Sequence, residues 1–225
     1  MDTRSSSVHK AYHEIRRKIQ TFSLVPAARI NEVNLANDLN ISRTPLREAL
    51  NRLVAEGLLV ERDRGFSVAD LEPEVVKDAF EARIEVECAT TRLACERATD
   101  EELAKLAEFV SMSAAESPDA SVEHLVMLDC KFHETIAELS RNSELLRILR
   151  NLNDRIYLIR WIAMDDKRSI TQEEHRQILE TLRKRDREEA ERLIRAHILH
   201  RTDEVLSAIK SAYAHVYTIR FGKTQ

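Results

Sequence analysis

Two arginines, Arg43 and Arg47, stand four residues apart in the segment ISRTPLREAL, residues 41–50. If this segment is helical, that spacing brings both guanidinium groups to one face, near the N-terminal end of the helix. A planar guanidinium can donate two hydrogen bonds to O6 and N7 of guanine, which the ammonium group of lysine cannot match. The pair therefore predicts a helix that reads base edges in the major groove of DNA.

The neighbouring residues carry the signals of a helix that begins at this point. Ser42 can cap the N-terminus with its hydroxyl, and Pro45 is tolerated only within a first turn. Upstream, residues 35–39 predict a short supporting helix, and Asn40 tolerates the left-handed backbone of a tight turn. Leucines then recur as a buried stripe on another face of the reading helix: Leu46, Leu50 and Leu53.

A short hairpin is predicted after this helix. Gly57 ends the helix, and residues 58–60 and 66–68 indicate two strands around the tip Arg-Asp-Arg-Gly, residues 62–65, which carries two further cations. A helix-turn-helix followed by a hairpin is a winged helix. An arbitrary arginine pair is more often a solvated helix face, so the surrounding pattern, rather than the charge itself, favours DNA binding.

The whole pattern resembles the GntR family of bacterial transcription regulators over about residues 8–70. The sequence departs from that family at Pro26-Ala27-Ala28, where Pro-Gly is usual. The resemblance implies that residues 1–70 bind DNA, with the wing tip in the minor groove. The contact positions that the resemblance implies are Arg43, Thr44, Arg47 and Gly65, and Ser42 and Arg64 are further candidates beside them.

Composition predicts a second, helical domain. The 225 residues are 43% apolar but only 5% aromatic, with three Gly and four Pro, which favours helices and allows two modest cores. Up to residue 70 the chain has 11 Lys plus Arg against 9 Asp plus Glu, and after it 24 against 30. A weakly basic first part suits phosphate contact by one domain only. No apolar run approaches the ~20 residues of a membrane span and no signal peptide is evident, so a cytoplasmic protein is expected.

Six amphipathic helices are predicted after residue 73. Their approximate ranges are 74–98, 100–114, 121–140, 143–164, 169–184 and 186–218. Connections this short place consecutive helices side by side in opposite directions. The expected fold is mainly α: an N-terminal winged helix-turn-helix followed by an antiparallel six-helix bundle in residues 71–225. Three cysteines without metal-type spacing are expected to be buried free thiols: Cys88, Cys95 and Cys130.

Polar residues interrupt the apolar faces of three bundle helices. Asp129 and His133 fall one turn apart within the stripe of the third, His175 lies in the stripe of the fifth, and His197 at the edge of the sixth. A single inward His is more often a hydrogen-bonded core residue, and an inward Asp is costly unless paired or liganded. Four such residues favour a metal site over a polar network, with one divalent ion per chain. One oxygen and three nitrogen ligands permit Zn, Ni, Co or Mn.

Such a site favours an anionic ligand. One carboxylate and three neutral imidazoles around a divalent cation leave a charge of about +1, and Arg83 is expected to project inward from the first bundle helix. A small carboxylate can coordinate the metal while Arg83 donates to another oxygen. Asn142, Arg155 and Arg160 are weaker candidates for the same lining. The alternative for Arg83 is an ion pair with Glu87, one turn further on.

The bundle resembles the FCD domain of the FadR-type subgroup of the GntR family, over residues 73–218. Metal-binding members of that subgroup carry an Asp-x-x-x-His pair, a Glu-His-x-x-Ile motif and a final His. These match Asp129 with His133, residues 174–178, and His197, as in the VanR-type branch. We therefore expect a homodimeric regulator, a repressor rather than an activator, that senses a small carboxylate effector. Two-fold symmetry then implies a palindromic operator.

Two alternatives to this interpretation stay open. The metal can be purely structural in a DNA-binding regulator, or it can activate water in a metal-dependent hydrolase. Glu174 is the only acid near the predicted site, and its angle on the helix points away from the stripe. Because no base is evident, we expect a regulator rather than an enzyme.

Overall fold

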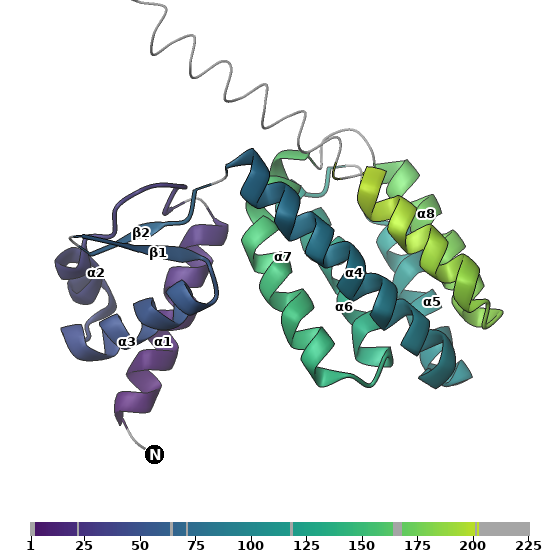
Figure 1. The fold of residues 1–225 in the computed structure, drawn as a ribbon, viewed down its shortest axis with the longest axis horizontal. Coiled ribbons are helices and arrows are strands. Elements are labelled where there is room, and N and C mark those ends of the chain that lie inside the picture. Colours follow the sequence, from purple (N-terminus) through teal and green to yellow (C-terminus); the bar gives the residue numbers. More distant parts are fainter. Residues whose placement is uncertain are drawn as a thin grey trace, which may run out of the picture. The chain divides into compact units, whose positions relative to one another are not determined.

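The computed structural model describes residues 3–21, 23–63, 65–70, 72–117, 119–163, 168–200 and 202. The chain divides into two compact units, residues 1–72 and 73–225. Both are built mainly from helices, and the first also contains one hairpin (Figure 1). The predicted fold class, mainly α with a winged helix-turn-helix ahead of a helical bundle, is confirmed.

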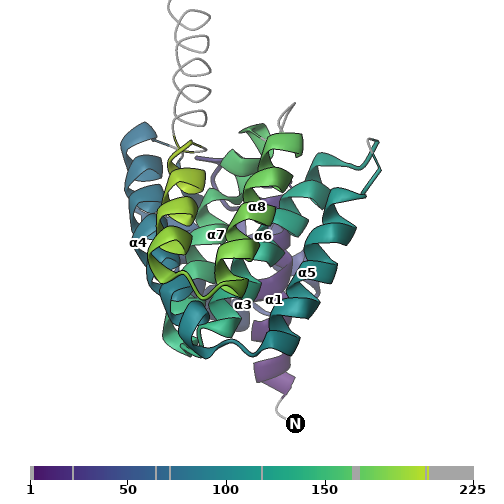
Figure 2. The same ribbon diagram turned by 90° about the vertical axis from the view of Figure 1, so that its right-hand side faces the viewer.

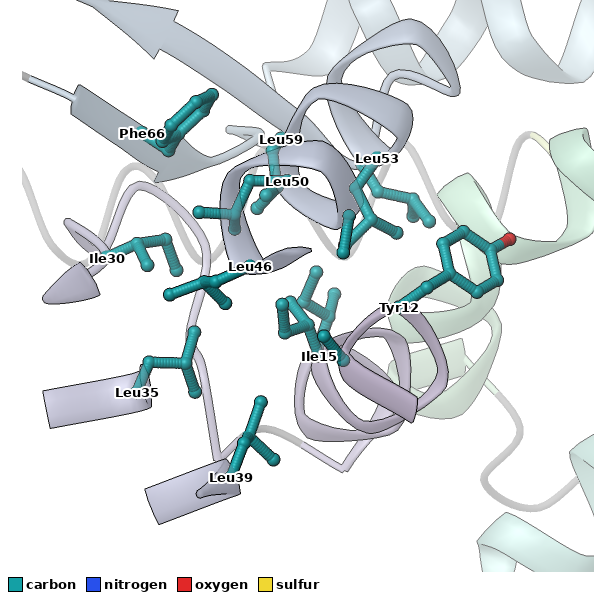
Figure 3. Packing of buried hydrophobic residues seen from close by; sticks show 14 of the residues in the cluster. Tyr12, Ile15, Ile30, Leu35, Leu39, Leu46, Leu50, Leu53, Leu59 and Phe66 are labelled. Atoms are coloured by element: carbon teal, nitrogen blue, oxygen red, sulfur yellow. The ribbon is translucent and has the colours of Figure 1, made fainter. Parts of the chain in front are cut away.

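The first unit is a winged helix-turn-helix. Its elements are α1 (Thr3–Gln20), α2 (Glu32–Leu39), α3 (Arg43–Ala55), β1 (Leu59–Arg62) and β2 (Gly65–Val68), the two strands being antiparallel. The predicted leucine stripe of α3 is fully buried and shares one core with Ile15 of α1 and Phe66 of β2 (Figure 3). This core fixes α3 against α1 and the hairpin, which leaves the opposite face of α3 free to be exposed.

The turns around α3 follow the predicted backbone but not the predicted cap. Asn40 has a φ of 52° and Gly57 a φ of 77°, both in the left-handed region. Ser42 occupies the N-cap position of α3, yet its side chain makes no capping hydrogen bond, so that expectation is wrong. A cap hydroxyl accepts from the N–H of the second or third helical residue. Here the third is Pro45, which has no N–H to donate.

The hairpin is longer than the sequence predicted. Its strands pair from Leu59 with Val68 to Arg62 with Gly65, which leaves only residues 63 and 64 at the tip. Gly65 has a φ of 123°, a conformation that other residues rarely adopt. The pairing therefore extends to the tip because a glycine stands where the chain must turn. Arg64, an expected DNA contact, lies outside the described residues.

The turn before α2 shows what replaces the usual Pro-Gly. Residues 25–28 form a turn closed by a 3.1 Å hydrogen bond from the N–H of Ala28 to the carbonyl of Val25. Ala27 has a φ of 60°. Since Pro26 must have a φ of about −65°, this is a type II turn, whose third position favours glycine. Ala27 thus adopts the glycine conformation at a steric cost of roughly 1 kcal/mol.

The second unit is a bundle whose described residues form six helices, at the positions that the sequence predicted. They are α4 (Pro73–Arg97), α5 (Asp100–Ala114), α6 (Val122–Leu139), α7 (Ser143–Ala163), α8 (Arg168–Arg183) and a helix over residues 187–200. Helix α4 packs against α6 and α7, and α5 packs against α6 and α8. Residues 203–218 of the predicted sixth helix lie outside the described residues.

The helix over residues 187–200 lies beside α4 and α8 (Figure 2). Ion pairs tie it to α4: Arg92 to Glu191 at 3.1 Å and Arg195 to Glu85 at 2.8 Å. These pairs are exposed or half-buried, so each contributes little to stability. Their value is in fixing the register of the last helix, which carries His197, against α4.

The three cysteines of the chain lie in the bundle. Cys88, Cys95 and Cys130 are free, as predicted; Cys88 and Cys95 are also buried, whereas the expectation of burial is wrong for Cys130, which is half-buried. Desolvation raises the pKa of Cys88 and Cys95 to about 11 and that of Cys130 to about 12. They are therefore protonated thiols rather than ready metal ligands.

In the part of the chain that the structure describes, none of the helices has the length and apolar character that a membrane crossing requires.

Candidate metal centre and DNA-reading face

The four residues singled out from the bundle stripes come together in its interior. One ligand atom from each of Asp129, His133, His175 and His197 lies within 4.8 Å of the others. The three imidazoles are 1%, 2% and 4% exposed. Helix α6 supplies Asp129 and His133 from adjacent turns, α8 supplies His175, and the last helix supplies His197. Three helices thus place one oxygen and three nitrogens around a common point.

Carboxylates set the direction in which two of these imidazoles point. Nδ1 of His133 lies 2.5 Å from Oε2 of Glu87, and Nδ1 of His197 lies 2.7 Å from Oε2 of Glu174. An ionised carboxylate only accepts hydrogen bonds, so each Nδ1 carries the proton and each Nε2 keeps its lone pair. The two Nε2 atoms face each other at 3.3 Å. Carboxylates hold metal-binding histidines in this way.

The third imidazole is held by stacking instead. The ring of His175 lies on that of Phe132, with centroids 3.8 Å apart and planes 16° from parallel. Its Nε2 is 3.2 Å from Oδ1 of Asp129, but neither atom has a hydrogen-bond partner among the described residues. Leaving a buried polar atom unpaired costs about 1–3 kcal/mol. A cation bound between them would satisfy both, so the donor set fits a metal ion.

The electrostatics keep these imidazoles neutral. Burial lowers the pKa of His133, takes that of His197 to about 4 and, with the neighbouring histidines, takes that of His175 well below its usual range. Burial alone would raise the pKa of Glu87, but Arg83 and His133 outweigh it and hold the pKa at about 2. Neutral imidazole is the form that binds metal, so the site is ready at neutral pH.

Two arginines border the centre, in different ways. Nε of Arg83 donates to Oε1 of Glu87 at 2.5 Å, both side chains being 3% exposed, so the alternative ion pair considered for Arg83 is formed. Its Nη2 is nevertheless buried without a hydrogen-bond partner among the described residues. Arg160 pairs with Oδ2 of Asp129, and its Nη1 donates to Oδ1 of Asn153 at 3.1 Å. Arg83 therefore keeps a donor for a ligand, whereas Arg160 supports a candidate metal ligand.

The other two candidates for the pocket, Asn142 and Arg155, belong to the start and the body of α7. Oδ1 of Asn142 accepts from the N–H groups of Glu144 and Leu145 at 3.2 and 3.1 Å, which caps α7. The side-chain oxygen of Asn142 is therefore occupied as a helix cap. Arg155 is half-buried on α7.

The candidate DNA-reading face spans the N-cap and the first two turns of α3. Ser42, Arg43, Thr44 and Arg47 are all exposed. Arg47 is directed by two neighbours, because its Nε lies 3.5 Å from Oε2 of Glu32 and its guanidinium lies 5.7 Å from the centroid of Phe66. Around them is a hollow of about 540 Å³ with this lining: Arg29, Ile30, Asn31, Glu32, Val33, Arg43 and Arg47.

Gly65 closes this face from the hairpin side. A Cβ added to it would lie 3.3 Å from Oε1 of Glu32, the same carboxylate that faces Arg47. Any side chain here would need both a strained backbone and a shift of Glu32. The wing glycine therefore matters for the shape of the reading face as well as for the hairpin turn.

Comparisons with known proteins give a family match for each of the two units. Residues 8–68 match the family of bacterial regulatory proteins, gntR family, and residues 78–200 match the FCD domain. The Nta operon transcriptional regulator of Aminobacter aminovorans is 41% identical over 194 residues, which cover 86% of this chain and 91% of that protein.

More distant relatives share the same organisation. The HTH-type transcriptional repressor RspR of Escherichia coli K12 is 23% identical over 197 residues, covering 86% of each chain. The solved structure of E. coli McbR/YncC superposes with a TM-score of 0.65 at 21% identity, over 94% of this chain and 98% of that one. At this identity the structural likeness shows the fold alone.

Proposed function

Because the chain belongs to the GntR family with an FCD domain, and is thus a DNA-binding transcription regulator, we propose that its bundle senses a small carboxylate at a metal centre. The observation that carries the proposal is the cluster of Asp129 with three buried histidines, two of whose ligand atoms lack any hydrogen-bond partner among the described residues. Ligand binding there changes the affinity of the first unit for its operator.

In this proposal Arg43 and Arg47 read bases in the major groove. Both are exposed on the first two turns of α3, and the contacts of Arg47 with Glu32 and Phe66 limit the directions in which its guanidinium can point. Ser42, whose hydroxyl is not used as a cap, and Thr44 are free to contact the phosphate backbone. Gly65, with Arg64, brings the wing to the minor groove.

Asp129, His133, His175 and His197 would hold one divalent ion, and Zn, Ni, Co and Mn all suit three imidazoles and one carboxylate. When bound, the ion supplies positive charge in a water-poor interior, where an anionic ligand is strongly attracted. Glu87 and Glu174 keep the two Nε2 atoms directed to the centre. Arg160 holds the second oxygen of Asp129, which leaves Oδ1 to face the ion.

The surrounding charges favour a carboxylate over a neutral ligand. Arg83 and Arg160 balance Glu87 and Glu174, so the centre keeps the charge of the ion and Asp129, about +1. The unused Nη2 of Arg83 is a buried donor close to the carboxylate that holds His133. A carboxylate oxygen would satisfy this donor with a charge-assisted hydrogen bond.

We further propose that the protein acts as a homodimer on a palindromic operator, and that it represses. A two-fold dimer presents two reading helices to two half-sites, and one relative with 23% identity is named a repressor. The ligand must bind the DNA-competent and the DNA-incompetent arrangements with different affinities. That difference is the whole coupling free energy, typically ~1–3 kcal/mol.

Operator release tests the proposal. An operator is selected from a random DNA pool, and its complex with metal-loaded protein is titrated with carboxylates, neutral sugars and amines. We expect a carboxylate to weaken binding about 5- to 150-fold, as that coupling implies, with the effect lost after EDTA treatment or in Arg83→Ala. If no ligand changes binding while EDTA lowers the melting temperature, the metal is purely structural.

A metal-dependent hydrolase is the weaker alternative. Glu174, the acid that such an enzyme would need as a base, instead accepts the hydrogen bond from Nδ1 of His197. The relatives of this chain that are named above are regulators of transcription. Turnover of an ester or amide by the metal-loaded protein, lost in His133→Ala, would favour this alternative.

A further inference from the structure

A second pair of imidazoles lies outside the bundle, on α1 of the first unit. His9 and His13 are one helical turn apart and both are exposed. Their Nε2 atoms lie 3.0 Å from each other, and their ring centroids are 4.1 Å apart with planes tilted by 53°. The two rings thus direct the same nitrogen to one point on the surface.

This nitrogen-to-nitrogen distance suits a shared metal ion. A metal–nitrogen bond of about 2.0–2.1 Å separates two ligand nitrogens by roughly 2.9 Å in a square-planar site and roughly 3.3 Å in a tetrahedral one. The observed 3.0 Å lies between these values. Two histidines at this helical spacing are also the pair that helical zinc motifs use. Without metal, the same contact is a hydrogen bond in which one Nε2 donates and the other accepts.

The neighbouring groups leave the pair free to bind an ion. Glu14 is paired with Arg17 at 2.6 Å, and the hydroxyl of Tyr12 donates to Glu56 at 2.7 Å. Desolvation, the neighbouring His9 and the cations Arg16 and Arg52 lower the pKa of His13, which favours the neutral ring. Among the described residues only the bundle cluster offers three or more converging ligands. Water must therefore complete the coordination at α1, which makes this a weaker and more exchangeable site.

We propose that His9 and His13 form a second transition-metal site, for ions that prefer imidazole: Cu²⁺, Ni²⁺ or Zn²⁺. Tyr12 lies between the two histidines on α1, and Ile15 follows them. Both belong to the core that also buries Leu46 and Leu50 of α3. An ion across this turn stabilises α1 and, by mass action, the folded first unit that carries the reading helix.

Untagged full-length protein with His133→Ala and His175→Ala, which disables the proposed bundle centre, is titrated with Cu²⁺. We expect one saturable site whose electron paramagnetic resonance spectrum shows nitrogen coupling from two imidazoles. Adding His9→Ala or His13→Ala should weaken binding at least tenfold, as loss of one ligand of a chelate does. Adding His124→Ala, which removes an imidazole already paired with Glu116 at 2.7 Å, should change nothing.

A parallel titration keeps the two metal proposals separate. In the wild-type background, His13→Ala should lose the weaker class of binding and keep the tighter one, with an unchanged circular dichroism spectrum. If the proposal of a metal centre in the bundle is wrong, the tighter class of binding will be missing, but the weaker class at His9 and His13 will still be measured. Two results would overturn the α1 site. The first is saturable Cu²⁺ binding by two nitrogens that survives substitution of both His9 and His13. The second is the absence of such binding from the protein with His133→Ala and His175→Ala.

Discussion

The candidate DNA-reading face and the candidate metal centre of the bundle use similar groups in opposite surroundings. On α3, Arg43 and Arg47 are exposed, and the ion pair of Arg47 with Glu32 is a loose 3.5 Å. In the bundle, Arg83 and Arg160 are only 2% and 6% exposed, and each is paired with a buried or half-buried carboxylate. An exposed cation keeps its hydration, whereas a buried one needs an anion. A surface site can therefore be specified by one short segment, but an interior site needs a network.

Loss of a candidate metal ligand should produce the largest effect, because the interior site is a chelate. His133→Ala or His175→Ala should take a bound divalent ion from about one per chain to near zero after dialysis, since three remaining ligands leave an incomplete site. Metal analysis of protein purified without chelator measures this. His124→Ala, outside the cluster, should keep full occupancy. If wild-type protein purified without chelator contains no divalent ion, the interior cluster is not a metal centre.

Loss of a reading arginine should be the next largest effect and should leave the fold intact. Arg43→Ala or Arg47→Ala should each weaken binding to the selected operator by ~1–3 kcal/mol, because each removes a two-pronged donor to a base edge. A gel shift at fixed salt is the measurement. Lys18→Ala serves as a control and should cost less, since it can at most remove a phosphate contact. Unchanged binding in both arginine variants would show that α3 is not the reading helix.

Removing a supporting carboxylate should test whether the interior site is truly a network. Glu87→Gln should lower metal affinity about 10- to 100-fold, because the carboxylate that directs Nε2 of His133 becomes a neutral amide. Competition with a chelating dye measures the change. Glu81→Gln, an exposed acid on the same helix that pairs with Lys77, is the matched control. Equal affinity in the two variants would mean that Glu87 only neutralises Arg83.

The smallest predicted effect concerns the turn that positions α2. Ala27→Gly should stabilise the first unit by up to about 1 kcal/mol, because glycine adopts the positive φ without steric cost. Urea unfolding measures the change. Ala28→Gly, at a position without positive φ, should be neutral or destabilising. Stabilisation by Ala28→Gly and not by Ala27→Gly would show that the strain lies elsewhere.

The two sites also differ in how far the sequence could predict them. The leucine stripe of α3, the left-handed Asn40 and the converging Asp and His residues all follow from helical periodicity, which is local. The Ser42 cap was wrong because the proline that marks the helix start also removes the N–H that a cap needs. For the reading face, little beyond these local patterns was required.

The supporting residues of the interior site were beyond periodicity alone. Glu87 was considered only as a partner of Arg83, although its second oxygen binds His133 across 46 positions of sequence. Glu174 was placed off the apolar stripe, yet from there it reaches His197 on the next helix. Such contacts depend on how neighbouring helices are rotated against each other. The sequence did contain one signal of this contact. Glu87 and Arg83 both fall on the buried side of α4, and a buried carboxylate has a second oxygen that needs a partner, here His133.

Thermal melting with a ligand panel tests the central claim most directly. If a carboxylate bridges the metal and Arg83, small organic acids should raise the melting temperature of metal-loaded protein by mass action, and EDTA or Arg83→Ala should abolish most of that rise. Neutral sugars and amines should have no effect. Stabilisation by neutral sugars that is indifferent to both EDTA and Arg83→Ala would contradict the account and place the effector outside the metal centre.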